Sequence, residues 1–316
     1  MRCARLPLAL ALAALLAAPT LSCRVGTILA RNGEALFSTP APVAHKITHP
    51  YRPDARLAVL WIGHASALVQ IDDKLVLTDP VFTETVGQLS RRLVEPGLDP
   101  AVLERVDAAL ISHMHFDHLS PGSLAMIEHK LGFLVVPQKG TGCIPDYAFE
   151  TVELATWASV ERGGLRITAV PVKHSGFRWV IDADWMDTSF TGYVIEYHGL
   201  TVYFGGDTAY AQDRFLATRA RFPSIDLALL PISPINPRAL MESTHVDPRE
   251  ALFALRDLGA RWMVPIHFGT FVNSVDPPGE PLRVLAAEMA AQGVGEDRVH
   301  VLAQGEQRVF LRRPGP

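Results

Sequence analysis

Cysteine is scarce in this chain of 316 residues, which contains three of them. Cys3 and Cys23 lie in the N-terminal stretch, so Cys143 is the single cysteine of the remaining sequence. This count excludes a cysteine-rich zinc module and a disulfide framework within the folded part. A metal ion bound by this protein must therefore be held by histidine and carboxylate side chains.

The chain also lacks a large excess of either positive or negative charge. The chain has 29 Lys and Arg against 33 Asp and Glu, a formal net charge of -4. Proteins that bind nucleic acid usually carry a basic stripe, and none is evident here, so we expect no nucleic-acid partner. The hydrophobic fraction of 48% and the charged fraction of 20% are typical of a globular protein with a sizeable core.

The chain has no hydrophobic run long enough to span a membrane comfortably. Its longest N-terminal run, residues 6–18, is well short of the ~20 apolar residues that a spanning helix needs. It follows Arg2 and Arg5 and precedes small residues and Cys23, which is typical of a secretory signal peptide over residues 1–22. We therefore expect an exported protein, either periplasmic or anchored to the membrane by a lipid on Cys23 as in a bacterial lipoprotein. An uncleaved N-terminal anchor is the alternative.

After this stretch the sequence divides into two parts. Residues 23–55 are rich in Pro, Gly, Ser and Thr with little periodicity, which predicts a linker and irregular lead-in, and residues 56–316 form one domain. Apolar runs predict strands at 57–62, 67–71, 75–78, 107–112, 133–136, 165–170, 190–197, 201–204, 225–230 and 262–266. Helices are predicted at 121–130, 247–258 and 281–292. This alternation indicates a layered architecture of strands and helices.

The densest group of metal-binding residue types is the run His113-Met114-His115-Phe116-Asp117-His118. In an extended segment alternate side chains share a side, so His113 and His115 can reach the same ion. Asp117 and His118 lie where the chain turns into the next helix and can face a second ion. Three imidazoles at a strand end would make poor core, so we interpret this segment, which we call the metal-binding run, as part of a metal site.

Further ligands should be His, Asp or Glu residues that directly follow other strands, because zinc takes about four ligands. His174, Asp207 and His267 meet this condition. Asp207 follows Gly205-Gly206, which allows close backbone packing at a turn. Each of the three alone could be an ordinary loop or turn residue. Together with the metal-binding run they predict a two-metal site.

These residues resemble the metallo-β-lactamase superfamily, whose αββα four-layer sandwich of α+β type is then the expected fold. The resemblance runs from about Leu57 to the C-terminus and is closest to the N-acyl-phosphatidylethanolamine-hydrolysing phospholipase D group and its bacterial relatives. The motifs that carry it, besides the metal-binding run, include Trp61-Ile62-Gly63-His64-Ala65-Ser66, Leu77-Thr78-Asp79-Pro80, Phe204-Gly205-Gly206-Asp207-Thr208, His245-Val246-Asp247-Pro248 and Ile266-His267-Phe268-Gly269-Thr270.

The resemblance implies two zinc ions, with iron or manganese as alternatives that the same ligands accept. It implies that one ion is held by His113, His115 and His174, the other by Asp117, His118 and His267, with Asp207 bridging. Asp79 would support a ligand histidine. We assign direct parts in catalysis to Asp117 and to His245, which would bind the phosphate or assist the leaving group. Two alternatives stay open: His245 could bond the backbone at a helix entry, and His64 could support a ligand or be an ordinary strand-end residue.

The expected activity is hydrolysis of a phosphodiester in a phospholipid-like substrate by metal-activated hydroxide, as in a phospholipase D. A lactonase or other ester hydrolase on the same two-metal site is the alternative enzyme. A surface protein that binds without turnover is the alternative from another class. The loop of residues 175–188 departs from the mammalian pattern, so we expect it to shape the substrate pocket.

Overall fold

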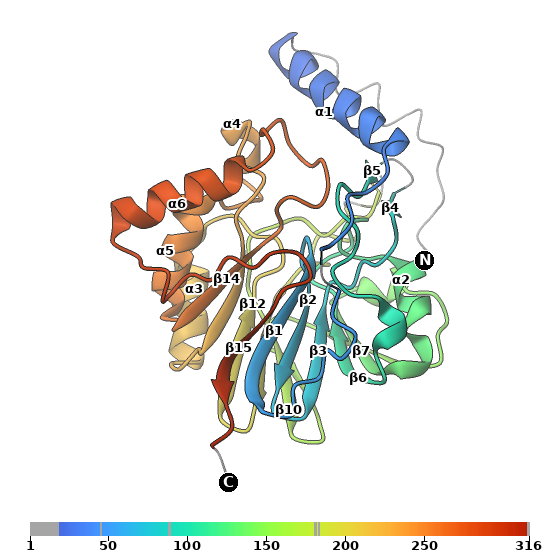
Figure 1. Ribbon diagram of the computed structural model, residues 1–316, viewed down its shortest axis with the longest axis vertical. Helices are drawn as coiled ribbons and strands as arrows, with labels where there is room; N and C mark the ends of the chain where they lie inside the picture. The colour runs from blue at the N-terminus through green and yellow to red at the C-terminus, as the bar shows by residue number, and fades with distance from the viewer. Residues whose placement is uncertain (1–18, 45, 88–89, 180–181, 183, 315–316) are drawn as a thin grey trace.

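Two β-sheets lie face to face in this computed structural model, which describes residues 19–44, 46–87, 90–179, 182 and 184–314. The predicted signal peptide falls almost wholly outside these residues. Helices cover the outer face of each sheet, so the molecule has four layers in the order αββα (Figure 1). This confirms the fold predicted from the sequence.

The first sheet has seven strands, and its two halves differ in direction. Neighbouring strands are antiparallel from β15 to β3 and parallel from β3 to β8. In spatial order the strands are β15 (Gln307–Arg312), β1 (Ala55–Gly63), β2 (Ser66–Ile71), β3 (Lys74–Thr78), β6 (Val106–Leu110), β7 (Leu131–Pro137) and β8 (Glu150–Leu154).

The second sheet has six strands and the same mixture of directions. Its strands are β14 (Trp262–Ile266), β13 (Leu227–Pro231), β12 (Leu200–Phe204), β11 (Gly192–Tyr197), β10 (Leu165–Val170) and β9 (Ser159–Arg162). The pairs from β14 to β12 are parallel and the others antiparallel. A small separate hairpin joins β4 (Thr85–Val86) and β5 (Ser90–Arg91).

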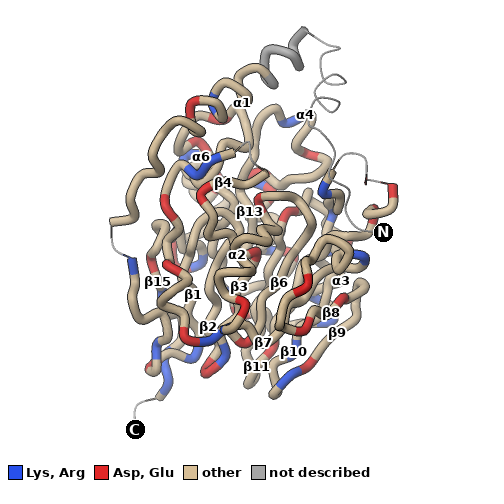
Figure 2. Tube along the Cα trace, turned by 90° about the vertical axis from the view of Figure 1, so that its right-hand side faces the viewer, with Lys and Arg blue, Asp and Glu red and all other residues tan. Residues whose placement is uncertain are grey.

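The core fills the space between the sheets and the space beneath the helices. One cluster of buried side chains joins both sheets to α5 (Pro248–Leu258), and another joins the first sheet to α2 (Pro121–Met126). Helices α3 (Gln212–Arg221), α4 (Arg238–Met241) and α6 (Glu280–Gln292) lie on the side of the second sheet (Figure 1). Charged residues are found mainly in the loops and at the strand ends (Figure 2).

Helix α5 shows why local sequence signals succeeded in this part of the chain. Asp247 accepts a hydrogen bond from the Glu250 backbone N–H, and the Glu250 carboxylate accepts one from the Asp247 backbone N–H, which completes a capping box. Pro248 occupies the first turn, where its missing N–H is not needed. Gly259 ends the helix in a left-handed conformation with φ 66°. The helix therefore begins and ends where these residues predict.

The segment at residues 23–55 corrects the prediction of an irregular lead-in. Residues 19–37 form helix α1 (Pro19–Phe37), and the segment is irregular only after it. Arg31 donates to the carbonyls of Ser274 and Asp276 at 3.0 and 2.8 Å, and Asn32 donates to the Val272 carbonyl at 3.1 Å. The helix is thus stabilised by contacts with a segment more than 200 residues away, which local composition does not reveal.

Two further findings concern Cys143 and the length of the helices. Cys143 is disulfide-bonded, a covalent link that the cysteine count did not lead us to expect. Among the described residues, none of the helices combines the length and apolar character needed to cross a bilayer.

Candidate metal centre

The predicted ligands meet at one end of the two sheets, where strands from both sheets stop. The metal-binding run follows β6, and His174 lies beyond the end of β10. Asp207 follows β12, and His267 is the first residue after β14. Because β12, β13 and β14 run parallel to one another, as do β3, β6 and β7, the carboxyl ends of these strands bring the side chains together.

The candidate ligand atoms form two adjacent groups. Suitable atoms of His113, His115 and His174 lie within 4.8 Å of one another, and so do those of His64, Asp117, His118 and His267. All seven ligands predicted from the sequence are thus brought together, and each predicted three-residue set is found within its own group. His64 is an addition to the second group.

Asp207 lies between the two groups. Its Oδ2 atom is 3.9 Å from His113 Nε2 and 4.0 Å from His174 Nε2, on the side of the first group. It is 3.3 Å from His118 Nε2, while Asp207 Oδ1 is 3.1 Å from His267 Nε2. A carboxylate that faces both groups at these distances has the position expected of a bridging ligand.

The backbone before Asp207 requires glycine. Gly206 has a left-handed φ of 56°, and a Cβ atom added there would lie 2.3 Å from the Cβ of Ser112. The turn after β12 therefore packs directly against the end of β6 in the other sheet. This close approach is what places the carboxylate of Asp207 beside the metal-binding run.

The outer nitrogens of three ligand histidines identify their tautomers. The Nδ1 atom of His118 lies 2.6 Å from Asp79 Oδ2, that of His174 lies 2.9 Å from the Thr244 carbonyl, and that of His267 lies 2.8 Å from the Ser233 carbonyl. These oxygens accept hydrogen bonds, so each Nδ1 carries a proton and donates it. In the neutral rings the Nε2 atoms then present lone pairs towards Asp207.

Two pairs of ring nitrogens also face each other inside the cluster, and only one nitrogen of each pair can carry a proton. His118 Nε2 lies 3.2 Å from His267 Nε2, and His113 Nε2 lies 2.8 Å from His115 Nδ1. The Nε2 atom of His174 is buried without a hydrogen-bond partner. Imidazole nitrogens and carboxylates gathered in this way suit a cation such as zinc, iron or manganese. The residues present therefore fit a pair of metal ions.

The charges of the cluster also favour metal binding. Burial lowers the pKa of His113 and His174 well below the usual value and that of His115 to about 4, so these rings are neutral, as metal ligands must be. Burial opposes charge on His118, but the surrounding carboxylates, Asp207 foremost, raise its pKa well above the usual value. In the metal-free protein a proton on His118 thus supplies part of the positive charge that metal ions would provide.

His64 belongs to the centre, which decides between the two alternatives left open by the sequence. Its Nε2 atom lies 2.9 Å from Asp117 Oδ2, and burial lowers its pKa to about 3. The neutral ring therefore donates to the carboxylate and orients it. His64 adopts a positive φ of 55°, as do Asp79 at 33° and His267 at 67°. Non-glycine residues in this region are uncommon, and three of them around one site indicate a conformation maintained for function.

His245 is also found at the centre, which contradicts a role confined to bonding the backbone at the start of α5. Its Nε2 atom is 3.2 Å from Asp207 Oδ2, and it forms a third group of candidate ligands with His174 and Asp207. Its Nδ1 atom lies 2.9 Å from Thr244 Oγ1. The neighbouring Val246 N–H donates to the Thr208 carbonyl at 2.7 Å, which fastens this segment to the turn that carries Asp207.

Sequence reasoning missed the residues that support the ligands through single contacts. Ser112 donates its hydroxyl to Asp79 at 2.6 Å, and it accepts a hydrogen bond from His113 Nδ1 at 3.0 Å. Thr270 accepts a hydrogen bond from the His64 backbone N–H at 2.7 Å. Thr270 ends a motif quoted above and Ser112 directly precedes the metal-binding run, so their positions were visible, but a hydroxyl group in such a position follows no recognisable sequence pattern.

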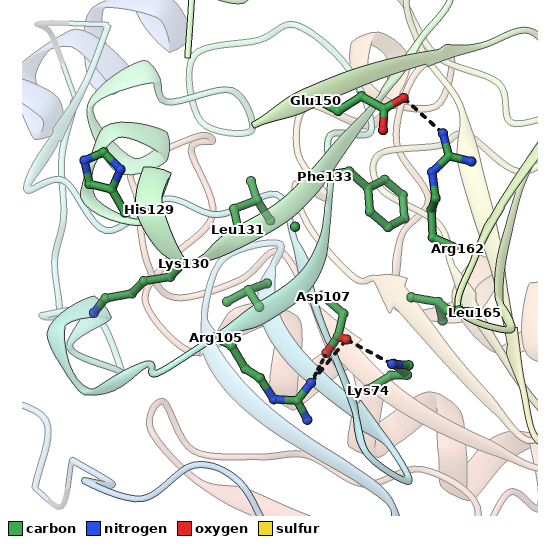
Figure 3. A pocket seen from close by; sticks show the side chains of 13 residues that line it. Lys74, Arg105, Asp107, His129, Lys130, Leu131, Phe133, Glu150, Arg162 and Leu165 are labelled. Carbon is green, nitrogen blue, oxygen red and sulfur yellow. Dashed lines mark hydrogen bonds and ion pairs between the residues drawn. The ribbon is translucent and has the colours of Figure 1, made fainter. Parts of the chain in front are cut away.

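A hollow at the opposite end of the strands has a different character (Figure 3). Its volume is about 510 Å³, and most of its charged groups are paired with one another, while Lys130 donates to backbone carbonyls. Asp107 contacts Lys74 and Arg105 at 3.2 Å each, and Glu150 contacts Arg162 at 3.0 Å. None of the described residues that line it belongs to the candidate metal groups.

The comparison with known proteins agrees with this geometry. Residues 74–268 match the family model described as the β-lactamase superfamily domain. The chain belongs to the β-lactamase superfamily. It is 34% identical over 281 residues to an uncharacterized protein of Mycobacterium tuberculosis, covering 83% of this chain and 72% of the relative.

One further relative and one solved structure are also similar to this chain. A protein named N-acyl-phosphatidylethanolamine-hydrolyzing phospholipase D 1 from Caenorhabditis elegans is 29% identical over 257 residues, which is 76% of this chain and 71% of that protein. The crystal structure of isothiocyanate hydrolase from Delia radicum gut bacteria shares the fold, with a TM-score of 0.62 at 18% identity over 80% of this chain and 99% of that one. Given also its relatives named metal-dependent hydrolases, the chain is a metal-dependent hydrolase of the superfamily.

Proposed function

We propose that this protein is an exported dinuclear zinc hydrolase that cleaves phosphodiesters of phospholipid-like substrates, as a phospholipase D does. The observation that carries the proposal is the convergence of two ligand groups on the buried carboxylate of Asp207. The name of the Caenorhabditis elegans relative supports the choice of substrate class.

The residues that would hold the ions follow from the two groups. His113, His115 and His174 would hold one ion, and Asp117, His118 and His267 the other, with Asp207 between them. Two divalent ions in these positions would lower the pKa of a water molecule between them towards ~7 and neutralise charge on phosphoryl oxygens. Iron or manganese would suit the same nitrogen and oxygen donors.

Several side chains of the protein prepare this reaction without belonging to either predicted three-residue set. His64 donates to Asp117 and so fixes the direction in which that carboxylate points. Asp79 accepts a hydrogen bond from His118 Nδ1 and so keeps the Nε2 atom of His118 directed into the centre. His245 is within reach of Asp207, where it can bind a phosphoryl oxygen or give a proton to the leaving alkoxide.

The proposed location fits the place of α1 in the fold. A lipid on Cys23 would be attached within α1 and would require that Cys143 is not paired with Cys23 in the mature chain. Helix α1 packs against residues 272–276, a few residues after the predicted ligand His267. An anchor there would hold the membrane on the side of the metal centre. Cell fractionation tests this part, because Cys23→Ser should move the protein from the membrane fraction to the soluble fraction. If that variant stays with the membrane, lipid attachment at Cys23 is wrong.

The activity is tested with purified protein loaded with zinc. We expect it to hydrolyse bis(p-nitrophenyl) phosphate and to release phosphatidic acid from phospholipid vesicles, with little action on lactones. A preparation that opens lactones but never cleaves a phosphodiester would contradict the proposal and favour the alternative ester hydrolase.

The variant His245→Gln addresses the assigned role of that histidine. It should lower kcat for phospholipid by about 10²-fold with metal content unchanged, since a positioned acid contributes roughly that factor. The matched control is His198→Gln, because His198 lies in the β11–β12 turn and its side chain is 59% exposed. The control should keep wild-type kcat. Equal kcat in all three proteins would show that His245 has no part in the reaction.

A further inference from the structure

Three consecutive residues of the loop after His174 pack onto the metal-binding run. The Phe177 ring lies 4.8 Å from the His115 ring, edge to face. The guanidinium carbon of Arg178 lies 4.4 Å from the centre of the Phe116 ring, and the Trp179 ring lies 4.8 Å from the same ring. Three consecutive residues of the loop thus contact two consecutive residues of the metal-binding run, although some 60 positions separate the two segments.

Arg178 fastens the two segments together. Its Nη1 atom donates to the carbonyls of Met114 and Leu119, at 2.9 and 3.0 Å. These two carbonyls lie at either end of the segment that contains His115, Asp117 and His118. Burial lowers the pKa of Arg178 to about 10, so the side chain is still a cation at neutral pH and makes charge-assisted hydrogen bonds.

The described residues of the loop make further contacts with one another. The carboxylate of Asp182, 3% exposed, accepts hydrogen bonds from the backbone N–H groups of Arg178 and Trp179 at 3.1 and 2.9 Å. Gly176 packs so closely that an added Cβ would lie 2.6 Å from the Met186 carbonyl oxygen. Phe177 and Trp179 are therefore presented by a braced turn.

These aromatic side chains are only partly buried, although they lie beside the metal centre. Phe116, Phe177 and Trp179 are all of intermediate exposure. Phe116 is itself the residue between two predicted ligands, His115 and Asp117, and it packs against the apolar group of Val81, Val86 and Phe271. Partly exposed aromatic surface next to a reaction centre can bury the apolar part of a ligand.

We propose that Phe116, Phe177 and Trp179, which we call the aromatic wall, bind the apolar chain of the substrate beside the metal centre, and that Arg178 holds this wall on the metal-binding run. The inference rests on the proposed phosphodiesterase activity and names the residues that select its substrate. The aromatic wall is a specificity determinant, and Arg178 is a positioning residue.

The test uses zinc-loaded protein and a series of p-nitrophenyl alkyl phosphodiesters from methyl to octyl. In the wild type, kcat/KM should rise by about twofold to threefold per added methylene, as partial burial of each CH₂ allows. Trp179→Ala should nearly abolish this rise, mainly through KM, so that the octyl ester loses far more kcat/KM than the methyl ester. Trp179→Leu, which keeps an apolar side chain, should restore part of the rise.

Binding provides a readout that does not depend on turnover. Calorimetric titration of butyl to decyl phosphonates into the zinc-loaded protein should show Kd falling with chain length in the wild type and hardly at all in Trp179→Ala. The matched control is Trp262→Ala. Trp262 is also partly buried, and the Arg261 guanidinium carbon lies 4.1 Å from its ring, but it begins β14 at the opposite end of the sheet. This control should retain the dependence on chain length.

Arg178→Met should separate positioning from specificity. Because Arg178 braces the metal-binding run itself, its loss should reduce zinc content as well as the dependence on chain length, whereas Trp179→Ala should keep full zinc content. If Trp179→Ala and Phe177→Ala keep the wild-type dependence, the aromatic wall is wrong. If the wild type cleaves no phosphodiester, the proposed function is wrong, and the phosphonate titration still decides whether the aromatic wall binds alkyl chains.

Discussion

The two ends of the central strands arrange their polar groups in opposite ways. At one end, the carboxylate of Asp207 is 3% exposed and imidazole nitrogens face one another at about 3 Å. At the other end, around the hollow in Figure 3, Asp107 and Glu150 are each paired with basic side chains. Buried polar atoms without hydrogen-bond partners cost free energy and are kept for a ligand. Paired charges at an exposed rim, in contrast, contribute little beyond solubility.

The largest expected difference between the two ends is in activity. Asp207→Ala should lower phosphodiester hydrolysis by at least ~10³-fold, because it removes the carboxylate between the two ligand groups. Metal content, measured by elemental analysis, should fall below one ion per chain. A variant that kept two ions and near wild-type kcat would show that Asp207 is not the bridging ligand.

Gly206 tests the close packing that brings Asp207 to the centre. Gly206→Ala should lower the free energy of unfolding by about 3 kcal/mol, from its positive φ together with the clash with Ser112. Gly199→Ala is the control, since Gly199 also has a positive φ, 77°, but no atom lies within 4 Å of its added Cβ. The control should cost about 1 kcal/mol. Equal losses in urea unfolding would mean that the clash has no energetic effect.

Asp79 tests the support behind the ligands. Asp79→Asn should weaken zinc binding about 10-fold to 100-fold, because an amide does not hold the His118 tautomer as a carboxylate does. Titration against a competing chelator measures this change. Zinc affinity equal to that of the wild type would indicate that His118 is oriented by its other contacts alone.

The smallest functional effect is expected at the opposite end of the strands. Asp107→Ala removes a carboxylate that contacts Lys74 and Arg105 and accepts a hydrogen bond from the Leu75 N–H. It should lower the free energy of unfolding by about 1 kcal/mol and leave kcat within about twofold of the wild type. A large loss of kcat in this variant would undermine the contrast between the two ends.

Much of the fold and the centre could be predicted because the signals are local. Strands such as β1, β12 and β14 are continuous apolar runs, and their ends identify where polar side chains must gather. Edge or surface elements such as β8, β9, β15 and α3 were missed because they mix exposed and buried residues without a clear period. Backbone pairing and tertiary contacts define these elements, and neither is encoded in hydrophobic spacing.

Contacts between distant segments account for what the sequence did not reveal of the site. The bond from His64 to Asp117 depends on a left-handed backbone at His64. The clamp formed by Arg178 depends on two carbonyl groups that any residue could supply. Helix α1 depends on docking against residues 272–276. In each case the chemical group was present in the sequence, but its partner was set by the fold.

The most direct test of the account is the metal content of the purified wild-type protein together with its activity before and after chelation. We predict close to two divalent ions per chain, loss of phosphodiester hydrolysis when they are removed, and its return when zinc is added. A fully active protein that contains no metal, or one whose activity is indifferent to removal of the ions, would contradict the central claim.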